Sequence, residues 1–346
     1  MQCYFKKYTL HFKKPGGTSR GVLNQKDTYF IFLKQGDNIA VGECNRFAGL
    51  SCDDREGFEQ KLQEVCNRLP DEKEALLNDL SEWPSIYFGV ETVLKDWHNN
   101  CQRIIFPEVI SENGFSIPVN GLIWMGSKDE MLQQIKSKLS EVYTSVKLKI
   151  GAIDFNTELN LIQFIRQQIN ANEVEIRLDA NGAFSFGEAK EKLKQLSEYD
   201  ISYIEQPIRA GQWQEMAALT ENSSIAIALD EELIGINTQH EREKLIKCIQ
   251  PQLLILKHAL IGGFSAADAW KKLIVENGGD WVITSALESN IGLNAIAQYT
   301  ALEKSEYVQG LGTGQLFTNN FPSPYNVDHN GLHYHPQQQW DLSALL

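Results

Sequence analysis

Two lysines in this chain are spaced so that they could act together in chemistry. Lys147 and Lys149 alternate with apolar residues in the segment Ser145–Ile150, and this period of two predicts a β-strand with both ammonium groups on one face. Like charges on one face repel, so such a pair either lies on a solvated strand edge or serves a site. The segment alone leaves both readings open.

Three carboxylates end three successive apolar segments further along the chain. They are Asp179, Glu205 and Asp230, and each stands at the carboxyl end of a predicted strand. If these strands lie side by side, the carboxylates converge and repel one another unless a cation lies between them. Oxygen ligands of this kind favour Mg²⁺, with Mn²⁺ as the alternative ion. Taken singly, each carboxylate would equally suit an ordinary salt bridge.

Lys257 ends the apolar segment Leu253–Lys257. We expect it to lie across the site from Lys147 and Lys149, with its pKa depressed by burial and by nearby cations, as a base near neutral pH requires. The alternative is a lysine that extends outward from a strand end. His258 faces the opposite way and is interpreted as structural. A role for Glu231 in supporting the metal ligands stays open.

The elements that must position these residues alternate between strand and helix. Several predicted strands carry a polar or charged residue at or next to their carboxyl ends, and these residues follow one another at intervals of 25 to 30 residues. Each interval has the length of one strand and one helix. The residues are Lys149, Asp179, Glu205, Asp230, Lys257 and Ser285. This rhythm predicts an α/β fold, a TIM-type (β/α) barrel whose active site lies at the carboxyl ends of the strands. The predicted strands are Ile117–Leu122, Ser145–Ile150, Glu175–Asp179, Ser202–Glu205, Ile225–Asp230, Leu253–Lys257, Trp281–Ser285 and Tyr307–Leu311, and the predicted helices include Lys128–Val142, Phe155–Ile169, Phe186–Leu196 and Phe264–Val275.

The chain divides into three parts by pattern. Residues 1–115 predict a separate α+β capping domain, residues 116–314 form the barrel, and residues 315–346 form a segment that packs back on the capping domain. The turn-rich residues 15–21 predict a mobile loop near the active site. The predicted strands of the capping domain are Cys3–Phe12, Asp27–Lys34 and Asn38–Glu43, and its predicted helices are Arg55–Arg68, Glu72–Leu80 and Ser85–Asn100.

Composition excludes several classes of partner. The chain of 346 residues is 42% hydrophobic and 22% charged, with a net charge of −13. The acidic balance argues against nucleic-acid and anionic-membrane partners, and no segment has the apolar length of a membrane span. Six cysteines without paired spacing indicate reduced thiols of a cytoplasmic protein. Oligomeric state is not predicted.

Two segments near the end of the predicted barrel are candidates for substrate binding. Ser285 begins a segment that leads into a helix over Gly292–Tyr299, where backbone N–H groups could hold a substrate carboxylate. The glycine-rich segment Gly310–Gly314 lacks the following helix that a nucleotide site needs. We expect its glycines, Gly312 among them, to leave space for substrate.

This ordered set resembles the enolase superfamily, in its muconate-lactonizing subgroup. The resemblance covers essentially the whole chain and implies a modified (β/α)₇β barrel with an α+β capping domain. On the segments Arg177–Asn181 and Ser285–Ser289, with Ile291–Leu293 following, the chain is most similar to the o-succinylbenzoate synthases. The related dipeptide epimerases carry an Asp-x-Asp on the eighth strand, and Gly310–Gly314 has no carboxylate.

The resemblance implies a Mg²⁺-dependent elimination of water from a small-molecule carboxylate, 2-succinyl-6-hydroxy-2,4-cyclohexadiene-1-carboxylate, in menaquinone synthesis. It implies that Lys149 is the base, that Lys147 adds positive charge and that Lys257 stabilises the planar intermediate from the opposite side. Arg20 would lie on a capping loop that closes over the substrate. An N-acylamino acid racemase or dipeptide epimerase, and a barrel that only binds a carboxylate ligand, are the alternatives.

Overall fold

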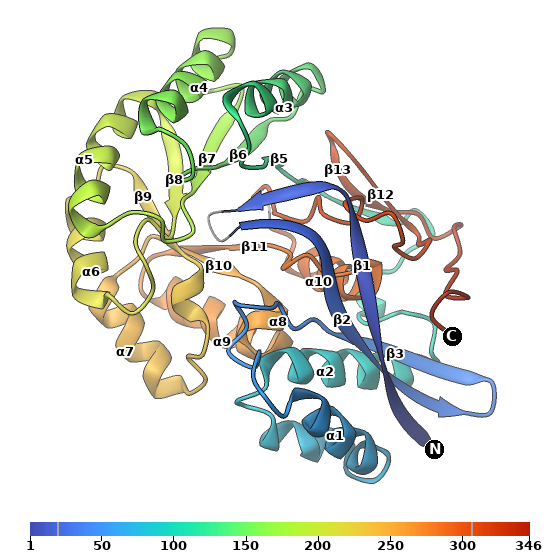
Figure 1. The fold of residues 1–346 in the computed structure, drawn as a ribbon. Helices are drawn as coiled ribbons and strands as arrows, with labels where there is room; N and C mark the ends of the chain where they lie inside the picture. Colours follow the sequence, from blue (N-terminus) through green and yellow to red (C-terminus); the bar gives the residue numbers. More distant parts are fainter. Residues whose placement is uncertain (19–20, 306) are drawn as a thin grey trace.

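The computed structural model describes the whole chain except residues 19, 20 and 306. A seven-stranded parallel sheet, in the order β11-β10-β9-β8-β7-β6-β5, curls into a barrel with helices along its outside (Figure 1). The predicted barrel fold is therefore confirmed. Its strands are β5 (Gly121–Ile123), β6 (Ser145–Lys149), β7 (Glu175–Asp179), β8 (Ile201–Glu205), β9 (Ala226–Leu229), β10 (Leu253–Leu256) and β11 (Asp280–Ile283).

The eighth strand is much shorter than the predicted Tyr307–Leu311. Among the described residues, Gln309 bridges to Val119 and Gly310 bridges to Thr284, both in parallel orientation. The Gly310 amide donates to the Ile283 carbonyl at 2.9 Å, and the Gln309 amide donates to the Pro118 carbonyl at 2.7 Å. These few bonds connect β11 to the segment before β5, so the barrel closes without a regular eighth strand.

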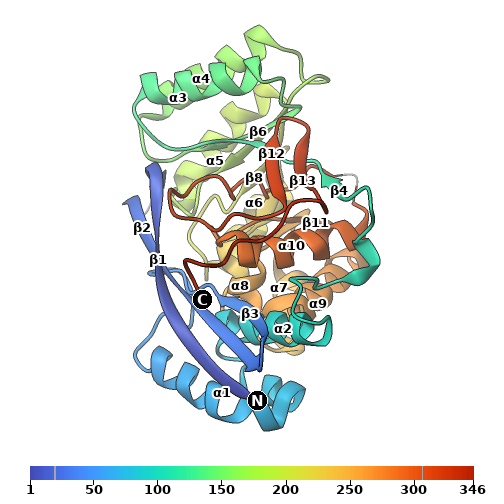
Figure 2. The same cartoon turned by 90° about the vertical axis from the view of Figure 1, so that its right-hand side faces the viewer.

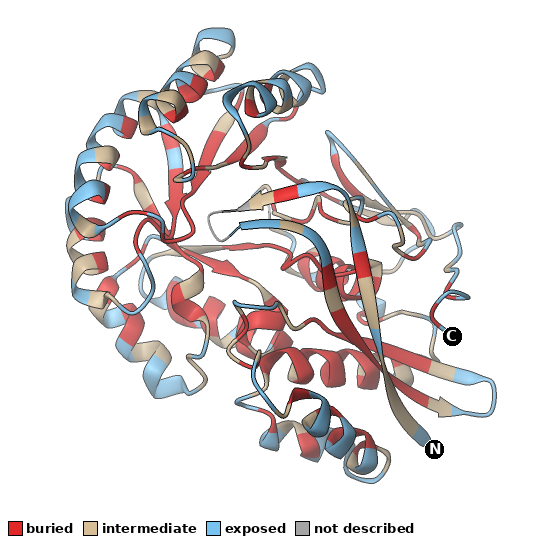
Figure 3. Ribbon diagram, in the orientation of Figure 1, coloured by how far each residue is buried: buried red, intermediate tan, exposed pale blue. Residues whose placement is uncertain are grey.

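The outer helices begin where the sequence provides side-chain caps. Ser127, Ser185 and Thr238 each form a capping box with a glutamate three residues later. Their inner faces are buried and their outer faces exposed (Figure 3). These helices are α3 (Lys128–Ser140), α4 (Phe155–Gln168), α5 (Phe186–Leu196), α6 (Trp213–Asn222), α7 (Gln239–Ile249), α8 (His258–Ile261), α9 (Gly263–Glu276) and α10 (Asn290–Glu303). None of the helices in the described chain is long and apolar enough to cross a membrane.

The N-terminal part forms an antiparallel sheet covered by helices. Its strands are β1 (Gln2–Thr18), β2 (Gly21–Gln35) and β3 (Asn38–Cys44), and its helices are α1 (Phe58–Glu72) and α2 (Pro84–His98). The predicted helix Glu72–Leu80 is a 3₁₀ helix, η1 (Lys73–Asp79), which directly follows α1. Buried residues of this sheet belong to two apolar clusters, one shared with α1 and α2 and one shared with C-terminal residues.

The predicted loop over residues 15–21 is largely strand. β1 continues to Thr18 and β2 resumes at Gly21, so the hairpin reaches over the barrel (Figure 1). Gly17 forms an antiparallel bridge with Met125, and a Cβ on Gly17 would lie 2.2 Å from the Met125 carbonyl oxygen. The glycines that suggested a loop instead allow two backbones to approach closely.

The C-terminal segment contains a hairpin that the sequence pattern did not reveal. β12 (Tyr325–Asp328) pairs with β13 (Gly331–Tyr334), which pairs with β4 (Phe115–Ile117). The predicted strand Ile117–Leu122 is therefore divided between this sheet and the barrel. The last residues lie against the N-terminal sheet (Figure 2), in one apolar cluster that includes Phe30, Phe32, Val41, Phe321, Leu342 and Leu345.

Candidate active site

Three buried carboxylates lie together at the carboxyl ends of neighbouring strands. Asp179 ends β7, Glu205 ends β8 and Asp230 directly follows β9. One oxygen from each lies within 4.8 Å of the others, and all three residues are at most 3% exposed. This arrangement can hold a metal ion, and the Glu205 Oε1 atom has no hydrogen-bond partner among the described residues.

The electrostatics of this triad show a crowded set of anions. Burial raises the pKa of Glu205 to about 8, with the charges of Asp179 and Asp230 adding to the effect of burial. Burial likewise raises the pKa of Asp230. Burial would also raise the pKa of Asp179, but the ammonium groups of Lys147 and Lys149 outweigh it and hold that pKa well below its ordinary value. A divalent cation would relieve the repulsion that remains.

Each carboxylate of the triad has a lysine as its ion-pair partner. Lys147 Nζ lies 2.5 Å from a Glu205 oxygen and 3.1 Å from an Asp179 oxygen. Lys149 Nζ donates to Asp179 at 2.7 Å. Lys257 donates to Asp230 from the following strand. The period-two pattern of β6 places both of its lysines on the inner face of the barrel, and the apolar β10 brings Lys257 to the same cluster.

The expected depressed pKa of Lys257 is wrong for this arrangement. Burial lowers the pKa of Lys257, but the carboxylates of Asp230 and Glu231 outweigh burial and the pKa is raised. The expectation placed a cation and two ammonium groups beside this lysine and left the carboxylates out. The pKa of Lys147 is raised in the same way, because Asp179 and Glu205 outweigh the effect of burial.

Asn181 and Glu231 extend this cluster on the side of Lys149. The Lys149 ammonium donates to Asn181 Oδ1 at 2.9 Å, and Asn181 Nδ2 donates to Glu231 Oε1 at 3.0 Å. Glu231 thus contacts the cluster through an amide, in line with the supporting role that was left open. Asn181 has a φ of 46°, a backbone conformation that asparagine tolerates better than most residues.

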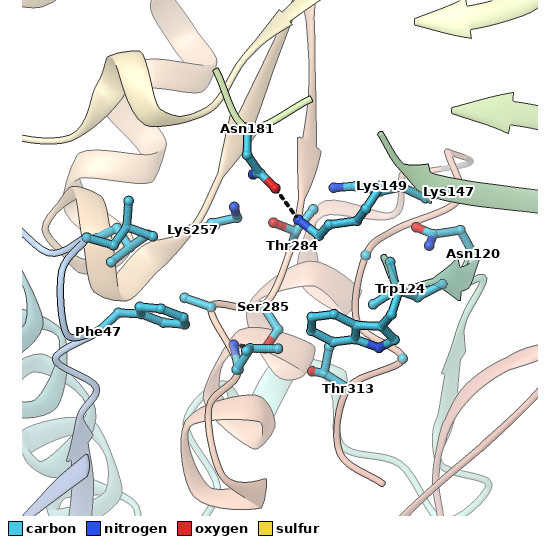
Figure 4. A pocket seen from close by; sticks show the side chains of 17 residues that line it. Phe47, Asn120, Trp124, Lys147, Lys149, Asn181, Lys257, Thr284, Ser285 and Thr313 are labelled. Atoms are coloured by element: carbon cyan, nitrogen blue, oxygen red, sulfur yellow. Dashed lines mark hydrogen bonds between the residues drawn. The ribbon is translucent and has the colours of Figure 1, made fainter. Parts of the chain in front are cut away.

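A pocket opens beside the cluster and encloses about 750 Å³, its open mouth included. Lys149 and Lys147 lie on one side of it and Lys257 on the other, with Asn181 between them (Figure 4). Phe47 and Trp124 form apolar walls. No Asp or Glu is among the described residues that line this pocket, so the nearest anions that it offers to a bound molecule are those of the acidic triad beside it.

The residues expected to bind substrate have different positions. Ser285 lines the pocket, but its hydroxyl donates to Glu288 Oε2 at 2.6 Å and accepts from the Leu287 amide at 2.9 Å. Gly312 also lines the pocket, and a Cβ there would meet nothing closer than 3.6 Å. Arg20 lies outside the described residues. The roles of these three in substrate binding stay predictions.

Several pocket residues were missed by reasoning from the sequence. Phe47 comes from the N-terminal domain, where no pattern connected it to the barrel. Thr284 and Thr313 lie beside the predicted Ser285 and Gly312, so their position at strand ends was an available signal. His258 is buried against the rings of Phe264 and Tyr299, away from the pocket, as its structural interpretation requires.

Known proteins share both the sequence and the fold of this chain. Residues 130–337 match the family described as "Enolase C-terminal domain-like". The o-succinylbenzoate synthase of Desulfotalea psychrophila is 43% identical, over 95% of this chain and 97% of the relative. The crystal structure of MenC from Desulfotalea psychrophila LSv54 has a TM-score of 0.84 at 39% identity and covers 96% of this chain and 99% of its own.

A solved structure of much lower sequence identity has the same fold. The L-Ala-D/L-Glu epimerase of Bacillus subtilis, solved as a substrate-liganded complex, has a TM-score of 0.83 at 18% identity and covers 98% of this chain and 97% of its own. The barrel, the acidic triad and the lysines on both sides of the pocket agree with the sequence match over most of the chain. This protein belongs to the enolase superfamily.

Proposed function

We propose that this chain is an o-succinylbenzoate synthase, a hydro-lyase of menaquinone synthesis. It would remove water from 2-succinyl-6-hydroxy-2,4-cyclohexadiene-1-carboxylate and release o-succinylbenzoate. The observation that carries this proposal is the 43% identity to a synthase over 95% of the chain, together with a pocket that has ammonium groups on both sides. We also propose the cytoplasm as its location, a proposal that six free cysteines support.

The acidic triad fits a divalent cation, and we propose Mg²⁺ held by Asp179, Glu205 and Asp230, with Mn²⁺ as a substitute. Three buried carboxylate oxygens within 4.8 Å of one another are the kind of ligands that this hard cation prefers. When bound, Mg²⁺ would stabilise the negative charge that develops on the substrate carboxylate as its α-proton is removed.

Lys149 supplies the proton chemistry. Lys149, in its neutral form, takes the proton from the ring carbon that bears the carboxylate. The electron pair of that C–H bond forms the new ring double bond as the bond from carbon 6 to the hydroxyl breaks. Lys149 then returns the proton to the departing hydroxyl, so that water and the aromatic product leave and the lysine is restored. Lys147 holds positive charge beside Glu205 and Asp179.

Lys257 occupies the opposite side of the pocket (Figure 4). Its ammonium group is held by Asp230, and in our proposal it stays charged and stabilises the planar ring from its other face. The apolar walls formed by Phe47 and Trp124 would exclude water from the ring.

Lysines on opposite sides of one carbon also suit a racemase, which is the second candidate. Against a dipeptide epimerase stands the absence of any Asp or Glu among the described residues that line the pocket, since the substrate ammonium of a dipeptide needs an anion. N-acylamino acids carry no such ammonium, so a racemase that acts on them is left for the assay to exclude.

The deciding experiment measures two reactions with the same Mg²⁺-loaded enzyme. Formation of o-succinylbenzoate from the cyclohexadiene carboxylate is followed beside α-proton exchange in D₂O on N-succinyl amino acids and dipeptides. We expect efficient dehydration that disappears in Lys149→Ala, which guards against a contaminating enzyme. Fast exchange with negligible o-succinylbenzoate would favour the racemase and refute the synthase.

A further inference from the structure

Two threonine hydroxyl groups in the pocket make no hydrogen bond to the described residues. Thr284 is 5% exposed and Thr313 is 7% exposed, and both line the pocket. Neither Oγ1 atom has a hydrogen-bond partner among the described residues. A buried hydroxyl without a partner costs free energy, so groups of this kind normally meet a ligand or an ordered water.

Ser285, their neighbour in the pocket, is different. Its hydroxyl proton is committed to Glu288 at 2.6 Å, and Glu288 is itself held at 2.9 Å by the Asn45 amide from the N-terminal domain. The Ser285 hydroxyl therefore has no proton left to offer a ligand. Among the described residues that line the pocket, the two threonines are the hydroxyl donors that remain available.

The backbone segments that carry these threonines are held by close packing or by a hydrogen bond. Thr284 has its methyl group against Gly310, where a Cβ would lie 2.5 Å from the Thr284 Cγ2 atom. Thr313 follows Gly312, and its carbonyl oxygen accepts from the Leu316 amide at 3.1 Å. Both hydroxyls are thus presented by constrained segments, which lowers the entropy lost when a ligand binds.

The two hydroxyls occupy different parts of the pocket. In the view of Figure 4, Thr284 lies between Lys257 and Lys149, whereas Thr313 lies at the other end of the pocket, below Trp124. A molecule whose reacting carbon meets the lysines would therefore reach Thr313 only with a substituent that extends away from them.

The proposed substrate has a substituent of this kind. Its ring carboxylate must lie near the lysines and the acidic triad, and its succinyl chain ends in a second carboxylate. We propose that the Thr313 hydroxyl donates a hydrogen bond to this terminal carboxylate and makes Thr313 a specificity-determining residue. This inference rests on the proposed function. The Thr313 hydroxyl can donate to an anionic acceptor, and the described pocket lining has no Asp or Glu that would repel a carboxylate there.

The test compares two ligands that differ only at the end of the chain. o-Succinylbenzoate carries the terminal carboxylate, and 2-butanoylbenzoate has a methyl group in its place. Dissociation constants for both are measured by calorimetry with the Mg²⁺-loaded protein. Thr313→Val should bind o-succinylbenzoate roughly 10-fold or more weakly while 2-butanoylbenzoate binds as before, because a hydrogen bond to a charged group is lost. Thr313→Ser, which keeps the hydroxyl, should restore most of the affinity.

Two matched controls use the same substitution elsewhere. Thr284→Val removes the other unpaired hydroxyl, which lies near the lysines, and should change the two affinities by the same factor. Thr300→Val removes a buried hydroxyl that bonds to the Ile296 carbonyl in α10, outside the pocket lining, and should leave both affinities unchanged.

The outcomes separate this inference from the proposed function. If Thr313→Val weakens both ligands equally, or neither, Thr313 does no more than hold water or shape the pocket, and the inference is wrong. If the selective loss appears in Thr284→Val instead, the terminal carboxylate lies at Thr284 and our placement is refuted. If the wild type neither forms nor binds o-succinylbenzoate, the proposed function itself fails, whatever the variants do.

Discussion

Replacing Lys149 by alanine should abolish turnover and leave the fold intact. The side chain is 12% exposed and makes two polar contacts, to Asp179 at 2.7 Å and to Asn181 at 2.9 Å. Asp179 keeps Lys147 at 3.1 Å and the Asn181 amide at 3.1 Å, so its charge is not left unpaired. We expect the free energy of unfolding to fall by about 1 kcal/mol, as for an ordinary substitution.

The effect on the reaction should be much larger. A positioned acid/base group usually contributes 10²- to 10⁴-fold, and we expect a loss of at least ~10³-fold in kcat, which is about 4 kcal/mol of activation free energy. The assay is o-succinylbenzoate formation at saturating Mg²⁺, with thermal unfolding measured on the same samples. Lys194→Ala, an exposed lysine near the end of α5, serves as the control and should behave as wild type.

One result would refute this reasoning. If Lys149→Ala keeps most of its activity while Lys147→Ala loses it, the roles within the pair are reversed. If both variants keep their activity, the lysine pair of β6 is not part of the reaction.

Three further predictions follow from the same geometry. Chelation with EDTA should abolish activity and Mg²⁺ should restore it, and Mg²⁺ at 100 times its dissociation constant should raise the free energy of unfolding by about 2.7 kcal/mol; full activity after rigorous chelation would contradict the metal assignment. Lys257→Arg should keep more dehydration activity than Lys149→Arg, because guanidinium preserves charge but cannot readily accept a proton; equal losses would indicate that both lysines transfer protons. Burial lowers the pKa of His258 from 6.5 to about 3. As the pH falls, His258 is therefore protonated in the unfolded chain before it is protonated in the folded one. The contribution of neutral His258 to the free energy of unfolding is fully present above pH 6.5 and is lost as the pH falls toward 3. The loss between pH 8 and pH 5 is about 2 kcal/mol. His258→Met should lose less stability over that interval in urea unfolding, and an identical pH dependence would show that His258 is not buried as a neutral group.

Local sequence patterns were enough to predict the fold class and the positions of the charged residues on the barrel strands. Alternation over Ser145–Ile150 and the apolar run before Lys257 are local properties, and a strand with a period of two can present its side chains in only one way. Regular intervals of 25 to 30 residues then placed each charged residue at a strand end. The structure agrees with these predictions because they do not depend on which strands pair with one another.

Other features depend on residues that are distant in the sequence and become neighbours only in the folded chain. Gly16 and Gly17 suggested a loop because glycine is permissive, yet both pair with β2, at Leu23 and Val22, and Gly17 also bridges to Met125. The segment Tyr307–Leu311 has a strand-like pattern, but its pairing is limited to Gln309 and Gly310 by the two edges it joins.

Charge and hydrogen bonding in the site depend even more on the fold. The pKa of Lys257 is raised because the Asp230 carboxylate, which follows the preceding strand, lies beside it. The charges that surround a side chain come from several segments, so one segment of sequence does not predict their combined effect. Ser285 and Thr313 have equivalent hydroxyls in the sequence. Glu288, anchored by Asn45 of the N-terminal domain, engages the first and leaves the second available. Which hydroxyl can serve a ligand is therefore settled by packing between domains, because a hydrogen bond is made or lost over distances that only the folded chain defines.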